Sequence, residues 1–179
     1  SFHQGYLMRT DVRPVTSYPT ATPLADYQFG ENSYKYLDMI RELCEKNDIP
    51  LVLMKAPSIY PVWYDEWEEQ MEDYAAEHNL MYINFLELID EVGIDFNTDT
   101  YDNGLHLNLP GAEKMAHYFG KILQDTYDLP DHRSDPEVAA AWQEKVDFYH
   151  EMEADQYREL EEYGYLKSYG GRPVDESKE

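Results

Sequence analysis

A chain of 179 residues, of which 42% are hydrophobic, is long and apolar enough to fold around a core. Its formal net charge of −23, from 37 acidic and 14 basic residues, argues against nucleic acid and anionic lipid as partners, because both require clustered Lys and Arg. A single cysteine excludes an intrachain disulfide, and no stretch reaches the ~18 apolar residues that a membrane span needs.

Residues 1–30 are expected to form an irregular arm that is ordered by docking, because prolines and a glycine punctuate the segment. The arm has no signal peptide and no initiator Met, which indicates a processed product or a cloned fragment of a longer parent. We therefore expect the parent protein to be extracytoplasmic or membrane-anchored, although this chain itself carries no signal or transmembrane segment.

Two amphipathic helices are predicted in the first half of the chain. The first covers residues 32–48, begins at a cap formed by Asn32 or Ser33, and places Cys44 on its apolar side as a buried structural thiol. The second covers residues 65–78 and is acidic in its first turns, as the helix dipole favours.

Two short apolar runs predict strands over residues 51–55 and 80–85. Continuous hydrophobicity is typical of strands that are buried on both faces of a parallel sheet. A short helix over 86–93 follows the second strand and ends at a glycine. The alternation of helices and strands favours an α/β fold with parallel strands, although two strands are too few for a complete doubly wound sheet.

A polar loop over 95–108 leads into a third major helix, which begins near Pro110 and Gly111. A long acidic helix is expected from about 137 to 163. The expected organisation has four parts, which are an irregular arm at 1–30, an α/β region at 31–135, an acidic helix at 136–166 and a flexible tail at 167–179.

The polar loop concentrates Asp99, Asp102, His106 and Asn108 just before the third helix. Ligands of open α/β sheets bind beyond the carboxyl ends of the strands, and the loop is expected at that edge. A histidine there can act as the base of a hydrolase, and a neighbouring carboxylate can orient its ring. Two other interpretations stay open: a structural loop with an Asn-Gly turn in which Asn108 caps the helix, or a cation site. The loop is poor in zinc and calcium ligands, so no metal and no cofactor is assigned.

The stretch YDNGLHLNLPGAEKMAHYFGKIL resembles the final motif of the SGNH (GDSL-like) hydrolase superfamily, in which an Asp precedes the catalytic His. The pattern Asp-x-x-x-His-Leu-Asn-x-x-Gly-Ala-x-Lys is especially similar to envelope-associated SGNH-like proteins of Gram-positive gut bacteria. The resemblance covers roughly residues 30–135. It implies that His106 is the catalytic base and Asp102 its orienting carboxylate, with Asp99 as the fallback partner. It also implies a partial flavodoxin-like, SGNH-type three-layer fold, of which this chain is the C-terminal half.

The sequence departs from the superfamily pattern at two points. The usual spacing is Asp-x-x-His, whereas Asp102 lies four positions before His106, and Gly104 could absorb the extra residue. The Gly-Asp-Ser-like nucleophile motif and the Gly and Asn oxyanion donors are missing. Ser58 follows the first strand, but its Lys-Ala-Pro-Ser context resembles no nucleophile motif. The nucleophile is therefore expected outside this chain, which alone should be a poor catalyst.

Trp63 and Tyr64 also follow the first strand, where aromatic rings either stack on the sugar rings of a substrate or pack the next helix onto the sheet. The first functional hypothesis is an SGNH-like esterase or O-acyltransferase acting on acylated envelope glycans or another small ester. The alternative is a non-catalytic acidic binding or scaffold module that retains the fold. A homodimer or the missing N-terminal half would cover the sheet edges that two strands leave open.

Overall fold

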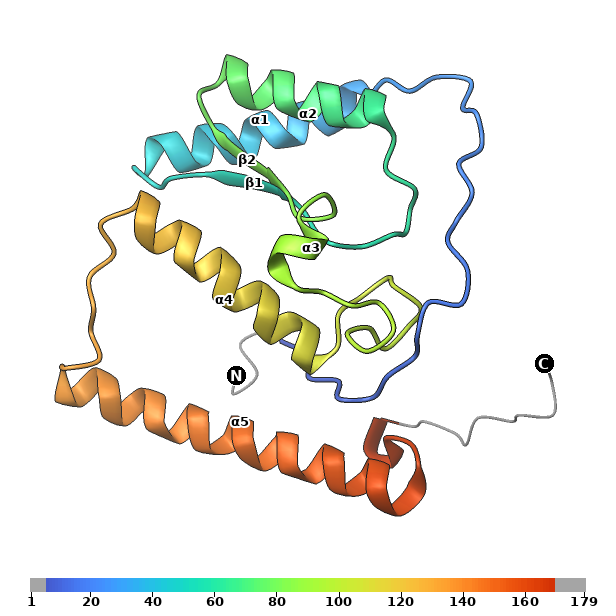
Figure 1. The fold of residues 1–179 in the computed structure, drawn as a ribbon. Coiled ribbons are helices and arrows are strands. Elements are labelled where there is room, and N and C mark those ends of the chain that lie inside the picture. The colour runs from blue at the N-terminus through green and yellow to red at the C-terminus, as the bar shows by residue number, and fades with distance from the viewer. Residues whose placement is uncertain (1–5, 170–179) are drawn as a thin grey trace. The chain divides into compact units, whose positions relative to one another are not determined.

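The computed structural model describes residues 6–169, which form a mixed α/β protein divided into two compact units (Figure 1). The sheet unit is Thr16–Val92, and the loop unit joins Ser1–Val15 to Gly93–Glu179. The start of the expected arm, residues 1–5, and residues 170–179 of the expected tail lie outside the described residues. Between residues 6 and 169, no helix is both long and apolar enough to cross a membrane.

The sheet unit contains five elements, which are α1 (Glu31–Lys46), β1 (Val52–Lys55), α2 (Asp65–Glu77), β2 (Met81–Asn84) and α3 (Ile89–Val92). The two strands pair in parallel, with Val52 opposite Met81 and Lys55 opposite Asn84. Parallel neighbours need a crossover connection, and α2 provides it. The expected parallel sheet is therefore present as one β-α-β unit, and it has two strands in the described part of the chain.

The predicted helix over 86–93 is shorter in the structure, where α3 covers only its end. The reason lies at the end of β2. The side-chain oxygen of Asn84 accepts the amide of Leu86 at 3.0 Å, and the Asn84 carbonyl accepts the amide of Glu87 at 3.3 Å. These bonds form a turn before the helix can begin.

The prediction that the strands are buried on both faces is wrong for β1, because Met54 is 45% exposed. The neighbouring helix α1 has no buried residue, and Cys44 is partly exposed rather than a buried thiol. The size of the sheet explains both results. Strand β1 pairs with β2 on one side only in the described residues, so the apolar side chains of β1 and α1 lack a further strand to pack against.

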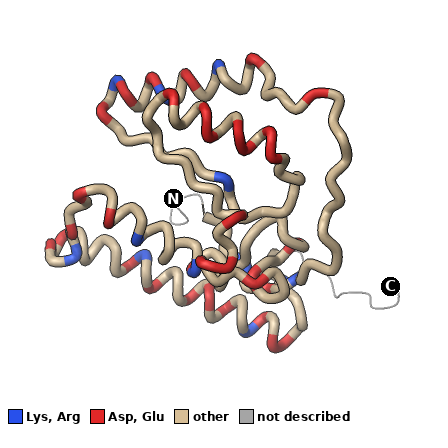
Figure 2. Tube along the Cα trace, turned by 45° about the horizontal axis from the view of Figure 1, so that its top comes forward, with Lys and Arg blue, Asp and Glu red and all other residues tan. Residues whose placement is uncertain are grey.

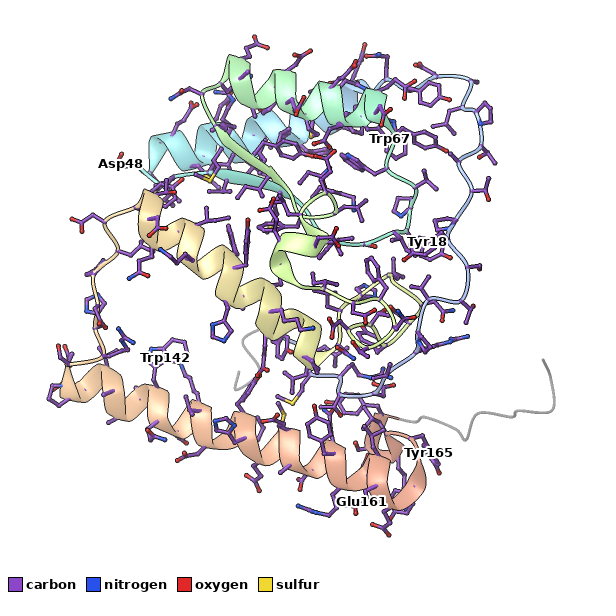
Figure 3. All side chains as sticks on the ribbon, viewed as in Figure 1. Tyr18, Asp48, Trp67, Trp142, Glu161 and Tyr165 are labelled. Atoms are coloured by element: carbon purple, nitrogen blue, oxygen red, sulfur yellow. The ribbon has the colours of Figure 1, made fainter. Side chains whose placement is uncertain are left out.

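Residues 16–30 form no helix or strand, and Tyr27 and Phe29 near the end of this segment contact α2. The ring of Phe29 stacks on Trp67 with 5.9 Å between the ring centroids. The amide of Phe29 donates to the side-chain oxygen of Gln70, whose amide nitrogen donates to the carbonyl of Tyr27, both at 2.9 Å. Trp67 lies near the start of α2 (Figure 3). Side-chain contacts thus order this part of the arm.

The loop unit contains α4 (Leu109–Thr126), α5 (Pro136–Tyr163) and a short 3-10 helix at Lys167–Tyr169. The side chain of Asp135 caps α5 by accepting the amides of Glu137 and Val138. The helix ends at Gly164, whose φ of 76° is left-handed and favours glycine. Both helices agree with the sequence expectation, whereas Lys167–Tyr169 is helical where a flexible tail was expected.

The described arm residues of the loop unit are held in place by the C-terminal half of α5. Gln156, which is 4% exposed, accepts hydrogen bonds from the amide and hydroxyl of Thr10 at 3.0 and 3.1 Å. Its amide nitrogen donates to the carbonyl of Met8 at 3.1 Å. Met8 is 1% exposed and belongs to a small core that also contains Ile94, Phe96, Leu109 and Leu166.

Acidic side chains recur along the helices, with Lys and Arg scattered between them rather than gathered in one patch (Figure 2). The first turn of α2 carries Asp65, Glu66 and Glu68. This distribution along the trace fits the net charge of −23.

Candidate active site

The loop over residues 95–108 is closed into a tight turn by Thr100. Its hydroxyl oxygen accepts the amide of Gly104 at 2.7 Å and donates to the carbonyl of His106 at 2.9 Å. Asn103 and Gly104 have φ values of 62° and 92°, a left-handed conformation that Asn and Gly tolerate best. This turn brings residue 106 back toward residue 102.

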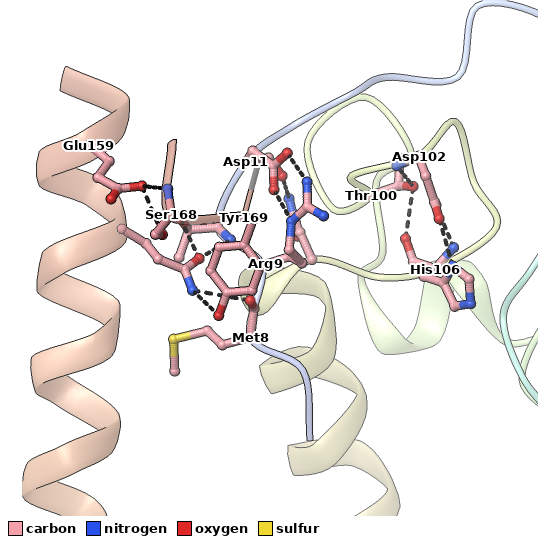
Figure 4. Close-up of polar contacts among 12 residues, drawn as sticks. Met8, Arg9, Asp11, Thr100, Asp102, His106, Glu159, Ser168 and Tyr169 are labelled. Carbon is pink, nitrogen blue, oxygen red and sulfur yellow. Dashed lines mark hydrogen bonds and ion pairs between the residues drawn. The ribbon is translucent and has the colours of Figure 1, made fainter. Parts of the chain in front are cut away.

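The turn places the side chains of Asp102 and His106 in direct contact (Figure 4). The His106 ring nitrogen Nδ1 lies 2.6 Å from Asp102 Oδ2. The backbone amide of His106 donates to the other carboxylate oxygen, Oδ1, at 2.7 Å. Both oxygens of Asp102 therefore bond to one residue, which fixes the position of Nδ1 relative to the carboxylate.

This geometry determines which ring nitrogen of His106 can act as a base. An ionised carboxylate only accepts hydrogen bonds, so Nδ1 carries the proton in the neutral ring and Nε2 keeps its lone pair. The His106 side chain is 59% exposed, whereas that of Asp102 is 25% exposed. An oriented imidazole with an accessible Nε2 is the arrangement that a hydrolase base requires.

Tyr101 and Arg9 extend this pair and were not predicted from the sequence. The Tyr101 ring stacks on His106, with 5.7 Å between the centroids and 8° between the planes. The Arg9 guanidinium lies 4.6 Å from the centroid of the Tyr101 ring. Burial and the nearby Asp102 carboxylate raise the pKa of the Tyr101 phenol, while Arg9 acts in the opposite direction. Tyr101 adjoins Asp102 in sequence, but no pattern links the loop to Arg9.

Asp99, the fallback partner for His106, is bound elsewhere in the structure. Its carboxylate accepts the amide of Asp95 at 2.7 Å and the hydroxyl of Thr98 at 3.2 Å. It also pairs with the ammonium group of Lys114 on α4 at 2.6 Å, and its side chain is 2% exposed. These contacts anchor the loop to α4, so the geometry favours Asp102 as the partner of His106.

Asn108, which was considered as a supporting residue, forms the N-cap of α4. Its side-chain oxygen accepts the amide of Gly111 at 3.2 Å. Its amide nitrogen donates to the carbonyls of Asp11 and Thr98 at 3.2 and 2.7 Å. The capping interpretation of this residue agrees with the structure, and the side chain also joins the arm to the loop.

Ser58 belongs to the sheet unit, whereas His106 and Asp102 belong to the loop unit. The Ser58 residue is 9% exposed. Its hydroxyl donates to the carbonyl of Tyr60 at 2.7 Å and accepts the amide of the same residue at 3.3 Å. The hydroxyl therefore serves a local turn, which gives no support to its role as nucleophile.

Trp63 and Tyr64 also belong to the sheet unit, and both take part in packing. The Trp63 indole donates to Glu68 at 2.6 Å, and the Tyr64 hydroxyl donates to the carbonyl of Thr22 at 2.8 Å. The same two rings line an open pocket of about 340 Å³ together with Tyr27. The remaining lining residues of this pocket are Ala21, Thr22, Pro23, Val62, Asp65 and Glu66. The two rings thus combine a packing role with an accessible aromatic surface.

The cation-site interpretation of the loop finds no support in the geometry. In residues 6–169, no group of three or more His, Cys, Asp or Glu side chains is arranged to hold a metal ion. The pair Asp102–His106 and the pair Asp99–Lys114 are separate contacts.

Comparison with known proteins gave no match, whether with protein-family models, curated proteins or solved structures.

Proposed function

We propose that this chain is the C-terminal portion of an SGNH-like esterase or O-acyltransferase that acts on acylated glycans of a bacterial cell envelope. One observation carries the proposal: Asp102 binds both the ring Nδ1 and the backbone amide of His106, at 2.6 and 2.7 Å, while the His106 side chain is 59% exposed. The resemblance of residues 101–114 to the final SGNH motif supplies the reaction class. The parent protein is extracytoplasmic or membrane-anchored in this proposal.

In the proposed reaction, His106 transfers a proton between a serine and the leaving group. A serine from a segment outside this chain gives its hydroxyl proton to Nε2 and attacks the acyl carbonyl carbon. The ester C–O bond breaks, the departing alkoxide takes the proton from Nε2, and the acyl group stays on the serine. Water or a sugar hydroxyl then gives its proton to Nε2 and accepts the acyl group, and the serine is regenerated.

The sheet unit is consistent with a partial flavodoxin-like fold of the SGNH type. The apolar residues of α1 and β1 that would meet a further strand are exposed, with Ile40 at 50%, Leu43 at 62% and Met54 at 45%. A two-stranded parallel sheet is uncommon, because such sheets are normally covered on both faces. We propose that the N-terminal half of the same protein adds strands beside β1 and covers these residues.

The pocket lined by Tyr27, Trp63 and Tyr64 is the proposed sugar-binding surface. Aromatic faces stack on the apolar faces of sugar rings, and the carboxylates of Asp65 and Glu66 at the pocket can accept hydrogen bonds from sugar hydroxyls.

Substitution of His106 by alanine in the complete protein tests the catalytic proposal. We expect hydrolysis of an O-acetylated glycan, or of p-nitrophenyl acetate as a simple ester, to fall by about 10³-fold or more. The matched control is His117→Ala, which removes an exposed histidine on α4. If the His106 variant is correctly folded and retains full activity, the proposal is wrong.

A specific observation also favours the second candidate, an acidic scaffold module. The N-terminal half of α5 exposes Trp142 by 55% and Val146 by 41%, and Trp142 projects from the helix (Figure 3). These residues line an open pocket of about 710 Å³ with Val138, and this apolar surface is of the kind that docks a second copy. Light scattering distinguishes the cases, since a strict monomer at high concentration contradicts self-association.

A further inference from the structure

The N-terminal arm forms backbone hydrogen bonds with the loop that carries His106 and with the start of α4 directly after the loop. The amide of Arg13 donates to the carbonyl of Thr100 at 2.9 Å, and the amide of Asn103 donates back to the carbonyl of Arg13 at 3.2 Å. At the other end, the amide of Leu109 donates to the carbonyl of Arg9 at 2.6 Å. The arm is therefore a fixed part of the candidate site, although it lies about ninety residues away in sequence.

Arg9 is itself held rigidly. Its Nε and Nη2 atoms donate to the two carboxylate oxygens of Asp11 at 2.8 and 2.6 Å (Figure 4). A bidentate pair of this kind fixes the plane of the guanidinium. The side chains of both residues are 24% exposed. The hydrogen bond to Asp11 also raises the pKa of Arg9, so the side chain remains a cation.

This fixed cation lies against Tyr101, which in turn stacks on His106. The guanidinium carbon of Arg9 is 4.6 Å from the Tyr101 centroid, a distance at which a cation is attracted to the ring face. The planes of Tyr101 and His106 differ by only 8°. The bonds from Asp102 fix the position of Nδ1, but a single ring contact leaves the imidazole able to swing about it. The face of Tyr101 removes that remaining freedom.

We propose that Tyr101, supported by the Arg9–Asp11 pair, is a positioning residue that sets the ring plane of His106 and hence the direction of Nε2. The role depends on the aromatic ring of Tyr101 rather than on its hydroxyl, because the two rings lie parallel, with 8° between their planes and 5.7 Å between their centroids. It makes the arm segment Arg9–Arg13 part of the catalytic apparatus in the proposed hydrolase, so its catalytic consequence rests on the proposed function.

The first test is spectroscopic and uses the present chain. The Hδ2 and Hε1 resonances of a ring that lies parallel to Tyr101, with 5.7 Å between the centroids, are displaced by the ring current of the tyrosine, and NMR of histidine-labelled protein measures this ring-current shift for His106. We expect Tyr101→Leu to abolish the shift and Tyr101→Phe to retain it. Arg9→Met should reduce the shift, because the tyrosine loses its support. Tyr127→Leu, which removes a partly buried ring at the end of α4, should leave it unchanged.

Unchanged His106 resonances in Tyr101→Leu, with the Thr100 and Asn108 amide resonances also in place, would overturn the proposal. If Tyr101→Leu does not fold, Tyr101→Phe and Arg9→Met decide the question, and an unchanged ring-current shift of His106 in Arg9→Met rejects the role of Arg9. In the complete protein, Tyr101→Leu should lower kcat by about tenfold with KM unchanged, and Tyr101→Phe should restore kcat. The spectroscopic result stands by itself if His106→Ala shows that the proposed hydrolase activity is wrong.

Discussion

The loop over residues 95–108 and the helix α1 differ in which side chains they bury. The loop is polar in sequence, yet Asp99 and Asn108 are each 1% exposed and Thr100 is 0% exposed. Helix α1 has an apolar stripe, yet none of its residues is buried and Leu43 is 62% exposed. Burial in this chain therefore follows the presence of a bonding or packing partner and not the polarity of the residue.

The loop can bury polar side chains because each of them has its hydrogen bonds satisfied. In the described residues, every buried side-chain nitrogen and oxygen has a hydrogen-bond partner. Burial of a polar group is costly only when its hydrogen bonds are lost, so the network removes that cost. The apolar stripe of α1 has no such solution within the sheet unit, since only another apolar surface can cover it.

Gly111→Ala is expected to cause the largest loss of stability, because the buried loop and α4 meet at that position. A Cβ atom at Gly111 would lie 2.5 Å from the Asp99 carbonyl oxygen and 2.9 Å from the Asp99 Cβ. Both atoms belong to the buried part of the loop and cannot move easily. We expect a loss of about 3 kcal/mol in the free energy of unfolding, measured by denaturant titration.

Gly120→Ala is the matched control, since a Cβ at that position on the same helix meets nothing within 4 Å. That variant should gain about 0.5–1 kcal/mol, because alanine favours a helix interior over glycine. Equal stability changes in the two variants would show that the loop does not pack tightly on α4.

The sequence predicts the helices and the central pair of the candidate site, but not the residue that supports that pair. The helices were predictable from the spacing of apolar residues, and the pair Asp102–His106 was predictable from the resemblance of its motif. The support of the pair by Arg9 was not predictable, because no periodicity or spacing joins an irregular arm to a distant loop. Local patterns report secondary structure, whereas contacts between irregular segments depend on the folded chain.

The exposure of α1 was also beyond the sequence pattern. The spacing of Leu37, Ile40 and Leu43 predicts an apolar face correctly, but it cannot say whether a partner covers that face. The same limit applies to Met54, whose strand shows the hydrophobicity of a central strand and the exposure of an edge. Hydrophobic spacing alone therefore overestimates the core around this two-stranded sheet.

An intermediate loss of stability is expected from Asn108→Ala, which tests whether the buried polar side chains of the loop stabilise the fold. The change leaves the Gly111 amide and the carbonyls of Asp11 and Thr98 without this side chain as a partner in a buried site. We expect a loss of about 2 kcal/mol, at the upper end for a helix cap, from thermal or denaturant unfolding. Asp135→Ala removes the exposed cap of α5 and should cost about half as much. Equal losses would mean that the two bonds to carbonyls contribute nothing.

The smallest change in stability is expected from Leu43→Lys, which tests whether the apolar stripe of α1 is uncovered in this chain. Because Leu43 is 62% exposed, the change should alter the free energy of unfolding of this chain by less than ~0.5 kcal/mol. Glu42→Gln, at the adjacent exposed position, makes the same change of +1 in net charge and controls for it. In the complete protein the two variants should separate, because a lysine at position 43 would be buried against the added strands and prevent assembly. A large loss of stability for Leu43→Lys in the chain alone would show that α1 already packs against a partner within it, and the proposed N-terminal half would then have no apolar surface to cover.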